Sequence, residues 1–383
     1  MSGIGRYTLQ LACALNELDT QVRITWLSAG QQNLHSRPAG ASPALLPGCD
    51  RLPGLVILGT VLLPSVARRL ALDVVHDPTG LAPFALGGGT ARTVVTVHDV
   101  FAWSIPGHST VADTLLYHHW LPRVLPQVDA VITDSQVSRT DIVRYLHLSS
   151  DRVHVIYPGV SSYLFRASEQ DSRSFEAKGR FPDHYILFVG SVEKRKNVDG
   201  LLRAYAGLRR MGEQRPLVVA GVQRSNARDL PQLVEQLGLQ GNVQFIGYVP
   251  DKDLPSLYSG ADLFVFPSLY EGFGLPPLEA MACGTPVVCS NAGSLPEVVG
   301  DAALMVDPHD TEGLTEAMRR VLADNELRLD LRRRGLRRAA EFTWERTAQE
   351  TLVVYERLLC PGRQLEVTPG GSPDPVRTGS GET

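Results

Sequence analysis

Two glutamates with seven residues between them flank a glycine-rich run in the C-terminal half of the chain. Glu271 and Glu279 stand on either side of Gly272-Phe273-Gly274-Leu275. The run follows the apolar strand pattern of Leu263 to Phe266 and leads into the helical pattern of Pro277 to Cys283. Glycines let a backbone approach a ligand, and helix N-terminal N–H groups bind phosphate or hydroxyl oxygens. A carboxylate accepts strongly from vicinal sugar hydroxyls. The alternative is an ordinary strand-to-helix turn capped by a glutamate.

A second element joins a glycine turn to a cluster of cations. The segment Gly190 to Asn197 follows the strand pattern of Tyr185 to Val189 and contains Arg195 and Lys196. Parallel α/β sheets bind anions at the carboxyl ends of their strands, and arginine and lysine neutralise phosphate there. The segment therefore predicts an anion site. The alternative is a solvated basic loop.

The remaining patterns are weaker. Gly247-Tyr248-Val249, followed by Leu254, ends a strand pattern and predicts either backbone contacts to a base or an ordinary turn. In the first half, His98-Asp99 and His76-Asp77 each end a strand pattern. A histidine at a strand end can hydrogen-bond a ligand; the alternative is a purely structural role.

Two sets of parallel strands would position these side chains. Short β-branched runs alternate with longer segments of helical spacing, such as Asn197 to Met211 and Leu230 to Leu237. This alternation predicts strands buried on both faces within βαβ units, and hence two doubly wound sheets. The predicted strands are Val74-Val75, Thr93 to Val97, Ala130 to Thr133, Val153 to Ile156, Tyr185 to Val189, Leu217 to Ala220, Val243 to Ile246, Leu263 to Phe266 and Pro286 to Cys289.

Composition excludes several other classes of protein. A chain of 383 residues predicts two domains, and a net charge of -4 argues against a nucleic-acid partner. The five cysteines are scattered without metal-ligand spacing, which favours a reducing cytoplasm. No stretch reaches the ~18 to 20 apolar residues of a membrane span, and no signal peptide is apparent. We therefore expect a cytoplasmic protein, at most peripheral to a membrane.

In this order and spacing, the motifs resemble those of the family-4 retaining glycosyltransferases (glycosyl transferases group 1) of the GT-B fold. The resemblance covers Gly3 to about Leu359 and is densest from Asp183 to Asp307. The opening Gly-Ile-Gly-Arg-Tyr-Thr and the Val97-His98-Asp99 strand end are most similar to bacterial mannosyltransferase-like members that build surface polysaccharides. The resemblance implies an α/β fold of two Rossmann-like doubly wound parallel-sheet domains facing across a cleft.

The resemblance also implies a role for each motif residue. Glu279 would accept hydrogen bonds from the donor ribose, and Glu271 would face the donor sugar. Lys196, with Arg195 nearby, would neutralise the leaving pyrophosphate, and His98 would contact the donor sugar across the cleft. Many relatives carry an arginine where this chain has Ser191, so Arg195 is the candidate residue to supply the positive charge that is missing there. Further donor contacts would come from Gly3, Gly5, Gly190, Gly247, Tyr248, Val249, Leu254, Gly272, Phe273, Gly274 and Leu275.

The same resemblance suggests the domain plan. We expect an N-terminal Rossmann-like acceptor domain over residues 1–165, a C-terminal Rossmann-like donor domain over 180–345, and a final helix over 346–360 that crosses back to the N-terminal domain. The polar stretch Ser161 to His184 would hold the boundary, and the Pro-, Gly- and Ser-rich residues 361–383 would form a disordered tail. Because a glycine turn normally follows a strand and none precedes Gly3, we expect the first strand to be missing and the true N-terminus to lie upstream.

The implied reaction is transfer of a hexose with retention, first of all mannose from GDP-mannose and then UDP-hexoses. The partners would be a nucleotide-sugar donor and a glycan or lipid-linked acceptor, with no nucleic acid, no cofactor and no metal. A lipid-linked acceptor would bring the enzyme into peripheral contact with the inner membrane face. Two alternatives remain: a GT-B nucleotide-sugar epimerase and a non-catalytic nucleotide-sugar-binding protein.

Overall fold

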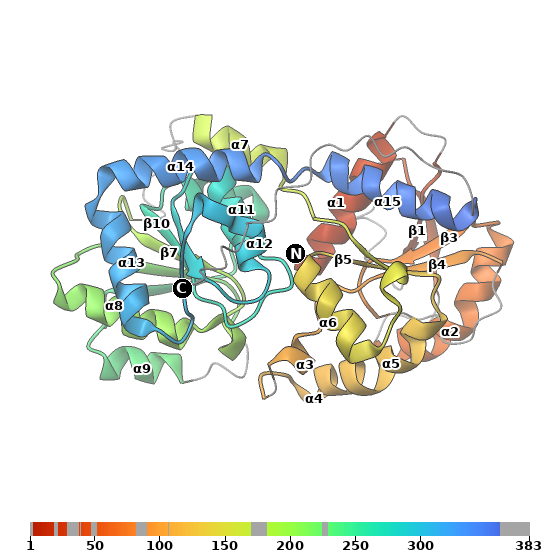
Figure 1. Cartoon of the computed structure of the whole chain (residues 1–383), viewed down its shortest axis with the longest axis horizontal. Coiled ribbons are helices and arrows are strands. Elements are labelled where there is room, and N and C mark those ends of the chain that lie inside the picture. Colours follow the sequence, from red (N-terminus) through yellow and green to blue (C-terminus); the bar gives the residue numbers. More distant parts are fainter. Residues whose placement is uncertain are drawn as a thin grey trace, which may run out of the picture. The chain divides into compact units, whose positions relative to one another are not determined.

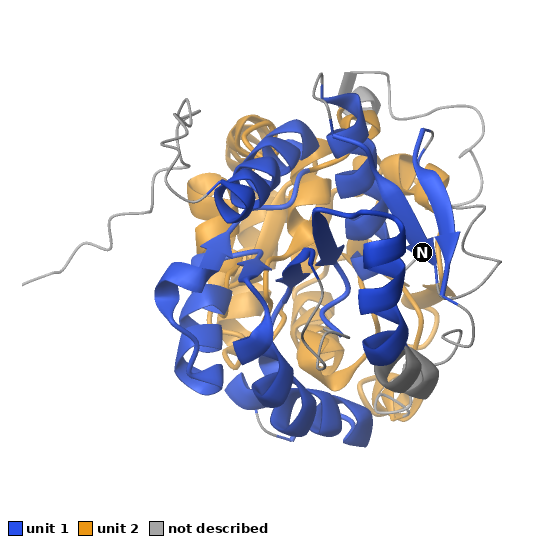
Figure 2. Cartoon of the chain, turned by 90° about the vertical axis from the view of Figure 1, so that its right-hand side faces the viewer, with its two compact units in different colours: residues 1–159, 343–370 blue, residues 160–342, 371–383 orange. Residues whose placement is uncertain are grey.

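The computed structural model describes residues 3–18, 22–28, 38, 40–46, 52–81, 90–105, 107–169, 182–223 and 229–360. The described residues divide into two compact units: those up to 159 and those of 343–360 belong to the first, and residues 160–342 to the second (Figure 2). The expected tail, 361–383, and the centre of the expected boundary, 170–181, lie outside the described residues. Within the described ranges, no helix is long and apolar enough to cross a membrane.

The second unit is built on a six-stranded parallel sheet in the order β9-β8-β7-β10-β11-β12 (Figure 1). Its four central strands are buried on both faces, as a sheet between two helix layers requires. The five strands predicted in this half are confirmed, whereas the short, partly exposed edge strand β12 was not predicted. The strands are β7 Ile186–Val189, β8 Leu217–Ala220, β9 Val243–Gly247, β10 Leu263–Phe266, β11 Val287–Ser290 and β12 Leu304–Val306.

The order of these strands reverses between β7 and β10. The sheet grows from β7 through β8 to β9, and the chain then returns to add β10 on the other side of β7, pairing Leu263 with Ile186. Ligands of open parallel sheets bind outside the carboxyl ends of the strands at such a reversal. The loops after β7 and β10 therefore emerge next to each other, and they carry the cationic segment and the Glu271 run.

Helices flank this sheet on both sides (Figure 1). Helix α8 packs against α13, and α11 packs against α14, α10 and α12. Helix α7 was not predicted, because its short amphipathic pattern lies in a polar stretch; its Leu164 is buried, and the helix packs on α10 and α11. The helices are α7 Ser162–Glu169, α8 Val198–Arg210, α9 Leu230–Gln236, α10 Leu254–Ser259, α11 Leu275–Ala282, α12 Leu295–Val299, α13 Thr311–Ala323 and α14 Asn325–Ala339.

The first unit contains a four-stranded parallel sheet in the chain order β3-β4-β5-β6 and a separate parallel pair, β1-β2. The four predicted strands are confirmed; β1 and β2 were not predicted, because they are short and only partly buried. The strands are β1 Thr25–Ser28, β2 Ser42–Leu45, β3 Val74–Asp77, β4 Arg92–Thr96, β5 Ala130–Thr133 and β6 Val153–Val155. The helices are α1 Gly3–Glu17, α2 Leu52–Arg69, α3 Phe101–Ser104, α4 Val111–Thr114, α5 Leu121–Val124, α6 Gln136–Leu146 and α15 Trp344–Leu359, with a π-helix at Leu115–Trp120.

The glycine loop expected at the start of the chain is instead the first turn of a helix. Both Gly3 and Gly5 lie within α1. The spacing of the buried side chains Tyr7, Leu11 and Leu15 is helical, and the Thr8 hydroxyl donates to the Ile4 carbonyl at 2.9 Å within the same turn.

Helix α15 packs against α1 within the first unit. Tyr7 and Leu11 of α1 form one apolar cluster with Trp344 and Ala348 of α15. Farther along α15, Val354 packs with Val94 and its neighbours in the sheet. The last described helix is therefore part of the core of the first unit.

A polar chain ties α15 to the sheet through His76 at the end of β3. The ring lies between the hydroxyl of Tyr355, 2.6 Å from Nδ1, and that of Thr96, 2.8 Å from Nε2. Some of the side chain reaches the surface, yet both ring nitrogens are hydrogen-bonded. Burial lowers the pKa of His76 to about 3, and the nearby His98 adds to the shift. The ring is therefore neutral at neutral pH.

This neutral histidine should make stability fall in mild acid. In the unfolded chain His76 takes up a proton near pH 6.5, and in the folded chain only near pH 3, so stability present above pH 6.5 is lost as the pH falls. We expect the free energy of unfolding to fall more steeply between pH 6.5 and 4 in the wild type than in His76→Gln, by up to ~1.4 kcal/mol per pH unit. Urea unfolding at a series of pH values measures both slopes. Equal slopes would contradict a buried neutral ring.

Candidate active site

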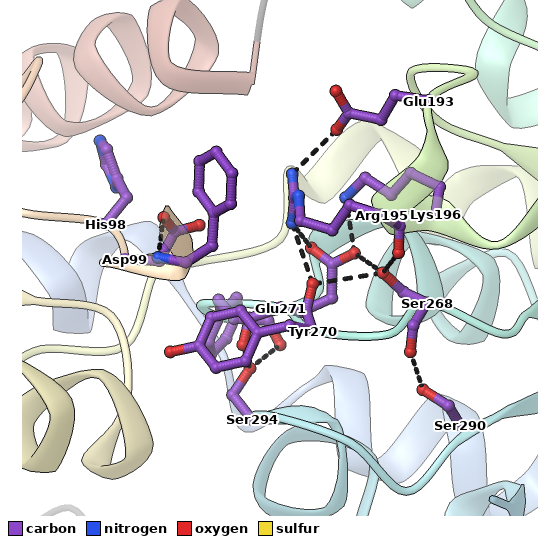
Figure 3. A network of polar contacts seen from close by, with 12 residues as sticks. His98, Asp99, Glu193, Arg195, Lys196, Ser268, Tyr270, Glu271, Ser290 and Ser294 are labelled. Carbon is purple, nitrogen blue, oxygen red and sulfur yellow. Dashed lines mark hydrogen bonds and ion pairs between the residues drawn. The ribbon is translucent and has the colours of Figure 1, made fainter. Parts of the chain in front are cut away.

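The loops after β7 and β10 meet in a buried ion pair. Nζ of Lys196 donates to Oε1 of Glu271 at 2.5 Å, and both side chains are about nine-tenths buried (Figure 3). Arg195 reaches the other carboxylate oxygen at 3.4 Å and donates to the Tyr270 carbonyl at 2.9 Å, while Glu193 holds its second nitrogen at 3.1 Å. The solvated basic loop is therefore wrong for Arg195 and Lys196.

Serines that the sequence analysis did not single out fix the glutamate. The hydroxyl of Ser268, just after β10, donates to the same carboxylate oxygen as Lys196 at 2.5 Å. The hydroxyl of Ser294 donates to the main-chain carbonyls of Glu271 at 3.0 Å and Phe273 at 2.7 Å. Ser290, at the end of β11, donates to the Ser268 carbonyl at 2.5 Å. Ser268 thus holds the carboxylate of Glu271, whereas Ser294 and Ser290 hold the backbone around it.

The charges of this cluster support one another. Burial would raise the pKa of Glu271, but Lys196, Arg195 and Ser268 outweigh burial and hold that pKa below its usual range. Burial, and then Arg195, hold the pKa of Lys196 below its usual range, and the opposing effect of Glu271 offsets them only in part. The carboxylate therefore stays ionised at neutral pH. The formal charges of Arg195 and Lys196 balance those of Glu193 and Glu271. The cluster therefore presents oriented hydrogen-bond donors without excess charge.

A glycine with a left-handed backbone conformation, in the loop after β11, packs against the backbone of the same glutamate. Gly293 has φ +59°, and a Cβ there would lie 2.7 Å from the main-chain N and O of Glu271. Ser294 N donates to that same carbonyl at 3.1 Å. The close contact of the two backbones therefore requires a residue without a side chain.

We expect Gly293→Ala to displace Glu271 and lower the activity of the site by about 10- to 100-fold, the size of effect that a ~1 Å misplacement in an active site has. The matched control is Gly238→Ala, with φ +67° but nothing within 4 Å of its Cβ. Both variants share the ~1 to 2 kcal/mol strain of a left-handed alanine. Urea unfolding and initial rates of the enzymatic reaction separate the two effects. If both variants lose the same stability and the same activity, the contact with Glu271 is irrelevant.

The second glutamate of the motif lies on helix α11. Glu279 is 5 % exposed, and the hydroxyl of Tyr258, from α10, donates to its Oε2 at 2.8 Å. The helix begins after Gly274, which has φ +108° and no side chain with which to cap. Because Glu271 points to Lys196, the alternative of a helix-capping glutamate is wrong.

The other expected donor contacts of the second unit lie at the same edge of its sheet. Gly190 and Gly247 stand at the ends of β7 and β9, where Gly190 N donates to the Ala220 carbonyl and Gly221 N to the Gly247 carbonyl. Side chains of this group differ widely in exposure: Tyr248 is exposed, whereas Val249, Leu254 and Phe273 are buried. Gly272, Phe273 and Gly274 form the buried turn before α11, and Leu275 is its first residue.

In the first unit, His98 follows β4 and is hydrogen-bonded at both ring nitrogens. Nδ1 lies 2.7 Å from Oδ2 of Asp134, and Nε2 lies 3.1 Å from the carbonyl of Pro78. The ring of Tyr7, one turn beyond Gly3, meets it edge-on at 4.8 Å between centroids. Asp134 was not predicted as a site residue; its signal in the sequence is a polar residue directly after a buried strand.

The fold and the cluster at the strand reversal together define a glycosyltransferase of the GT-B fold. The family model for glycosyl transferases group 1 matches residues 171–338, and that for glycosyltransferase family 4 matches residues 1–162. The chain belongs to this family of glycosyltransferases. The O-antigen chain mannosyltransferase B of Escherichia coli is 34 % identical over 94 % of this chain and 97 % of its own length.

Further similarities agree with this assignment. The MMP alpha-(1->4)-mannosyltransferase of Mycolicibacterium hassiacum is 36 % identical over 76 % of this chain and 72 % of its own length. Among solved structures, sucrose-phosphate synthase from Thermosynechococcus elongatus matches with a TM-score of 0.76 at 24 % identity, covering 93 % of this chain and 94 % of its own. WaaG, a glycosyltransferase involved in lipopolysaccharide biosynthesis, matches with a TM-score of 0.71 at 19 % identity, covering 93 % and 96 %. These two structures support the fold.

Proposed function

We propose that the protein transfers mannose from GDP-mannose to a glycan or lipid-linked glycan in surface polysaccharide synthesis, with retention at the anomeric carbon. The names of the two mannosyltransferase relatives support the sugar, and the O-antigen in the name of one of them supports the pathway. The observation that carries the proposal is the Lys196–Glu271 pair with Arg195 beside it, at the strand reversal of the second unit. Such a reaction would take place in the cytoplasm, and a lipid-linked acceptor would bring the enzyme to the inner membrane face.

Each residue of the site then has a chemical task. Lys196 and Arg195 donate to the diphosphate, and the loop from Gly272 to Leu275 offers backbone N–H groups to sugar and phosphate. Glu279 accepts hydrogen bonds from the ribose, and Glu271 faces the donor sugar while holding the cations in place. His98, in the first unit, contacts the donor sugar. Because these hydrogen-bond donors are oriented before the substrate arrives, the protein needs little reorganisation as negative charge develops on the diphosphate.

The reaction exchanges one bond at the anomeric carbon for another on the same face. The bond to the diphosphate oxygen breaks and the acceptor hydroxyl forms the new one, while its proton passes to the departing diphosphate. Positive charge develops on the sugar and negative charge on the leaving group. Lys196 and Arg195 stabilise the latter charge, a task that a metal ion performs in other enzymes. We therefore propose a metal-independent reaction.

A thermal-shift panel of GDP, UDP, ADP and dTDP with their sugar conjugates tests the donor. Stabilisation by guanine nucleotides alone, abolished in Glu279→Ala, would support GDP-mannose; preference for another base would refute it. NMR of the glycoside formed reports the anomeric configuration, and an inverted product would refute retention. Loss of transfer with a chelator and recovery with a divalent cation would refute metal independence. Binding without turnover would favour the non-catalytic alternative, and release of an epimerised nucleotide sugar would favour the epimerase.

A further inference from the structure

The hydrogen bonds of His98 determine its protonation. Asp134 Oδ2 lies 2.7 Å from Nδ1, and the Pro78 carbonyl oxygen lies 3.1 Å from Nε2. A carbonyl oxygen and an ionised carboxylate can only accept hydrogen bonds, so both ring nitrogens must donate. A neutral imidazole has one N–H, and the imidazolium has two.

We propose that Asp134 is a positioning residue that holds His98 as an imidazolium joining the ends of three neighbouring strands. Pro78 follows β3, His98 follows β4 and Asp134 follows β5, and these strands are consecutive in the sheet. The ring is thereby fixed in orientation as well as in charge. The proposal rests on the proposed function only for what His98 then does, which is to contact the donor sugar.

The surroundings of the pair favour this charge state. Asp134 is 5 % exposed, and its second oxygen, Oδ1, is buried with no hydrogen-bond partner among the described residues. A buried carboxylate is costly unless a cation compensates it, and His98 is the positive partner that contacts it. Burial alone would lower the pKa of His98, but Asp134, the Pro78 carbonyl and Asp99 outweigh burial, so the net shift is upward.

Apart from Asp134 and the adjacent Asp99, the titratable groups that face His98 are neutral at neutral pH. Tyr7 of α1 presents its ring edge, and burial raises the pKa of its phenol. His76 of β3 is neutral because burial lowers its pKa to about 3. The electrostatic balance is therefore set by the imidazolium, Asp134 and the adjacent Asp99.

Loss of the proton would break one of the two hydrogen bonds. The remaining hydrogen would stay on Nδ1, where it bonds to Asp134. The lone pair of Nε2 would then face the Pro78 carbonyl oxygen, and these two atoms would repel each other. The hydrogen bond between His98 Nε2 and the Pro78 carbonyl therefore exists only while His98 is protonated.

The first test follows the His98 ring itself. Histidine side-chain NMR of the full chain, with the His98 signals assigned by their loss in His98→Gln, gives the proton affinity of the ring. Asp134→Asn keeps the shape of the side chain and removes its charge, and we expect the proton affinity of His98 to fall at least ~10-fold. Asp129→Asn is the control, because Asp129 binds Arg92 and Thr93 at the opposite end of β4. An unchanged His98 titration in Asp134→Asn overturns the proposal, and so does an equal fall in the control.

The second test links the pair to transfer. Because the arrangement requires the imidazolium, kcat/KM should decline as the pH rises through the pKa of His98, and the decline should begin at least about one pH unit lower in Asp134→Asn. Asp134→Glu should restore part of the wild-type profile. Identical profiles for wild type and Asp134→Asn would show that the pair does not position His98 for transfer. If the wild type transfers no mannose, the proposed function fails, while the ring titration still decides the role of Asp134.

Discussion

Lys196→Met should lower sugar transfer at least ~10²-fold, the usual effect of removing one preorganised donor to a developing negative charge. The same substitution leaves the buried Glu271 carboxylate with Arg195 at 3.4 Å and the hydroxyl of Ser268. Removing one member of a buried ion pair destabilises a fold by ~3 to 5 kcal/mol, and these two remaining partners place the expected loss at the lower end. Initial rates and urea unfolding measure the two effects.

Two further variants separate chemistry from folding. Lys194→Met removes a cation from the same loop, but its side chain is exposed, and we expect transfer within a few-fold of wild type. Lys196→Met combined with Glu271→Gln removes both buried charges and should recover much of the lost stability. If the double variant also recovers transfer, Lys196 acts by holding the fold and not by stabilising the diphosphate.

Glu279→Ala should weaken the binding of a nucleoside diphosphate by roughly 10²-fold. Each hydroxyl hydrogen bond that the carboxylate accepts contributes ~1.5 to 3 kcal/mol to the binding free energy in a water-excluded site. In the alanine variant, water that takes the place of the carboxylate offsets part of this loss. The ribose is remote from the reacting carbon, so kcat at saturating donor should change much less than KM. Isothermal titration with GDP and steady-state kinetics measure both.

The control for Glu279 is its hydrogen-bond partner. Tyr258→Phe removes the phenol that donates to Oε2 and leaves the carboxylate in place. We expect a stability loss of ~1 kcal/mol and nearly unchanged GDP affinity. Because every nucleotide carries the ribose, Glu279→Ala should also weaken UDP binding by the same factor. Unchanged GDP affinity in Glu279→Ala would rule out the ribose contact.

The buried strands were the most predictable part of the fold. Segments such as Leu217–Ala220 and Leu263–Phe266 are apolar on both faces, and only the interior of a parallel sheet accommodates that pattern. Strands β1, β2 and β12 were missed because partly exposed strands of three or four residues carry no such signal. The start of α1 was missed because glycines normally indicate a turn, and here the packing of Tyr7 and Leu11 against α15 overrides that preference.

The candidate site was predictable in its residue types and less so in its contacts. The spacing of the motif placed Lys196 and Glu271 in one site by resemblance, whereas their direct ion pair depends on β10 returning beside β7, which sequence order does not reveal. The supporting hydroxyls of Ser268 and Ser294 could not be predicted, because a serine in a loop has many local partners. The pairing of His98 with Asp134 likewise depends on the register of β4 and β5.

The contact between α1 and α15 also sets the order in which the protein can be completed during synthesis. The described residues of the second unit, 160–342, form one continuous stretch, so their sheet and helices can assemble once residue 342 has left the ribosome. The first unit begins earlier but lacks a helix of its core until Trp344 to Leu359 has been made. Domains usually fold in the order of their N-termini; here the unit that starts second is finished first. Until then the apolar side of α1 that carries Tyr7, Leu11 and Leu15 has no covering helix, and the nascent chain must be kept from aggregating through that surface.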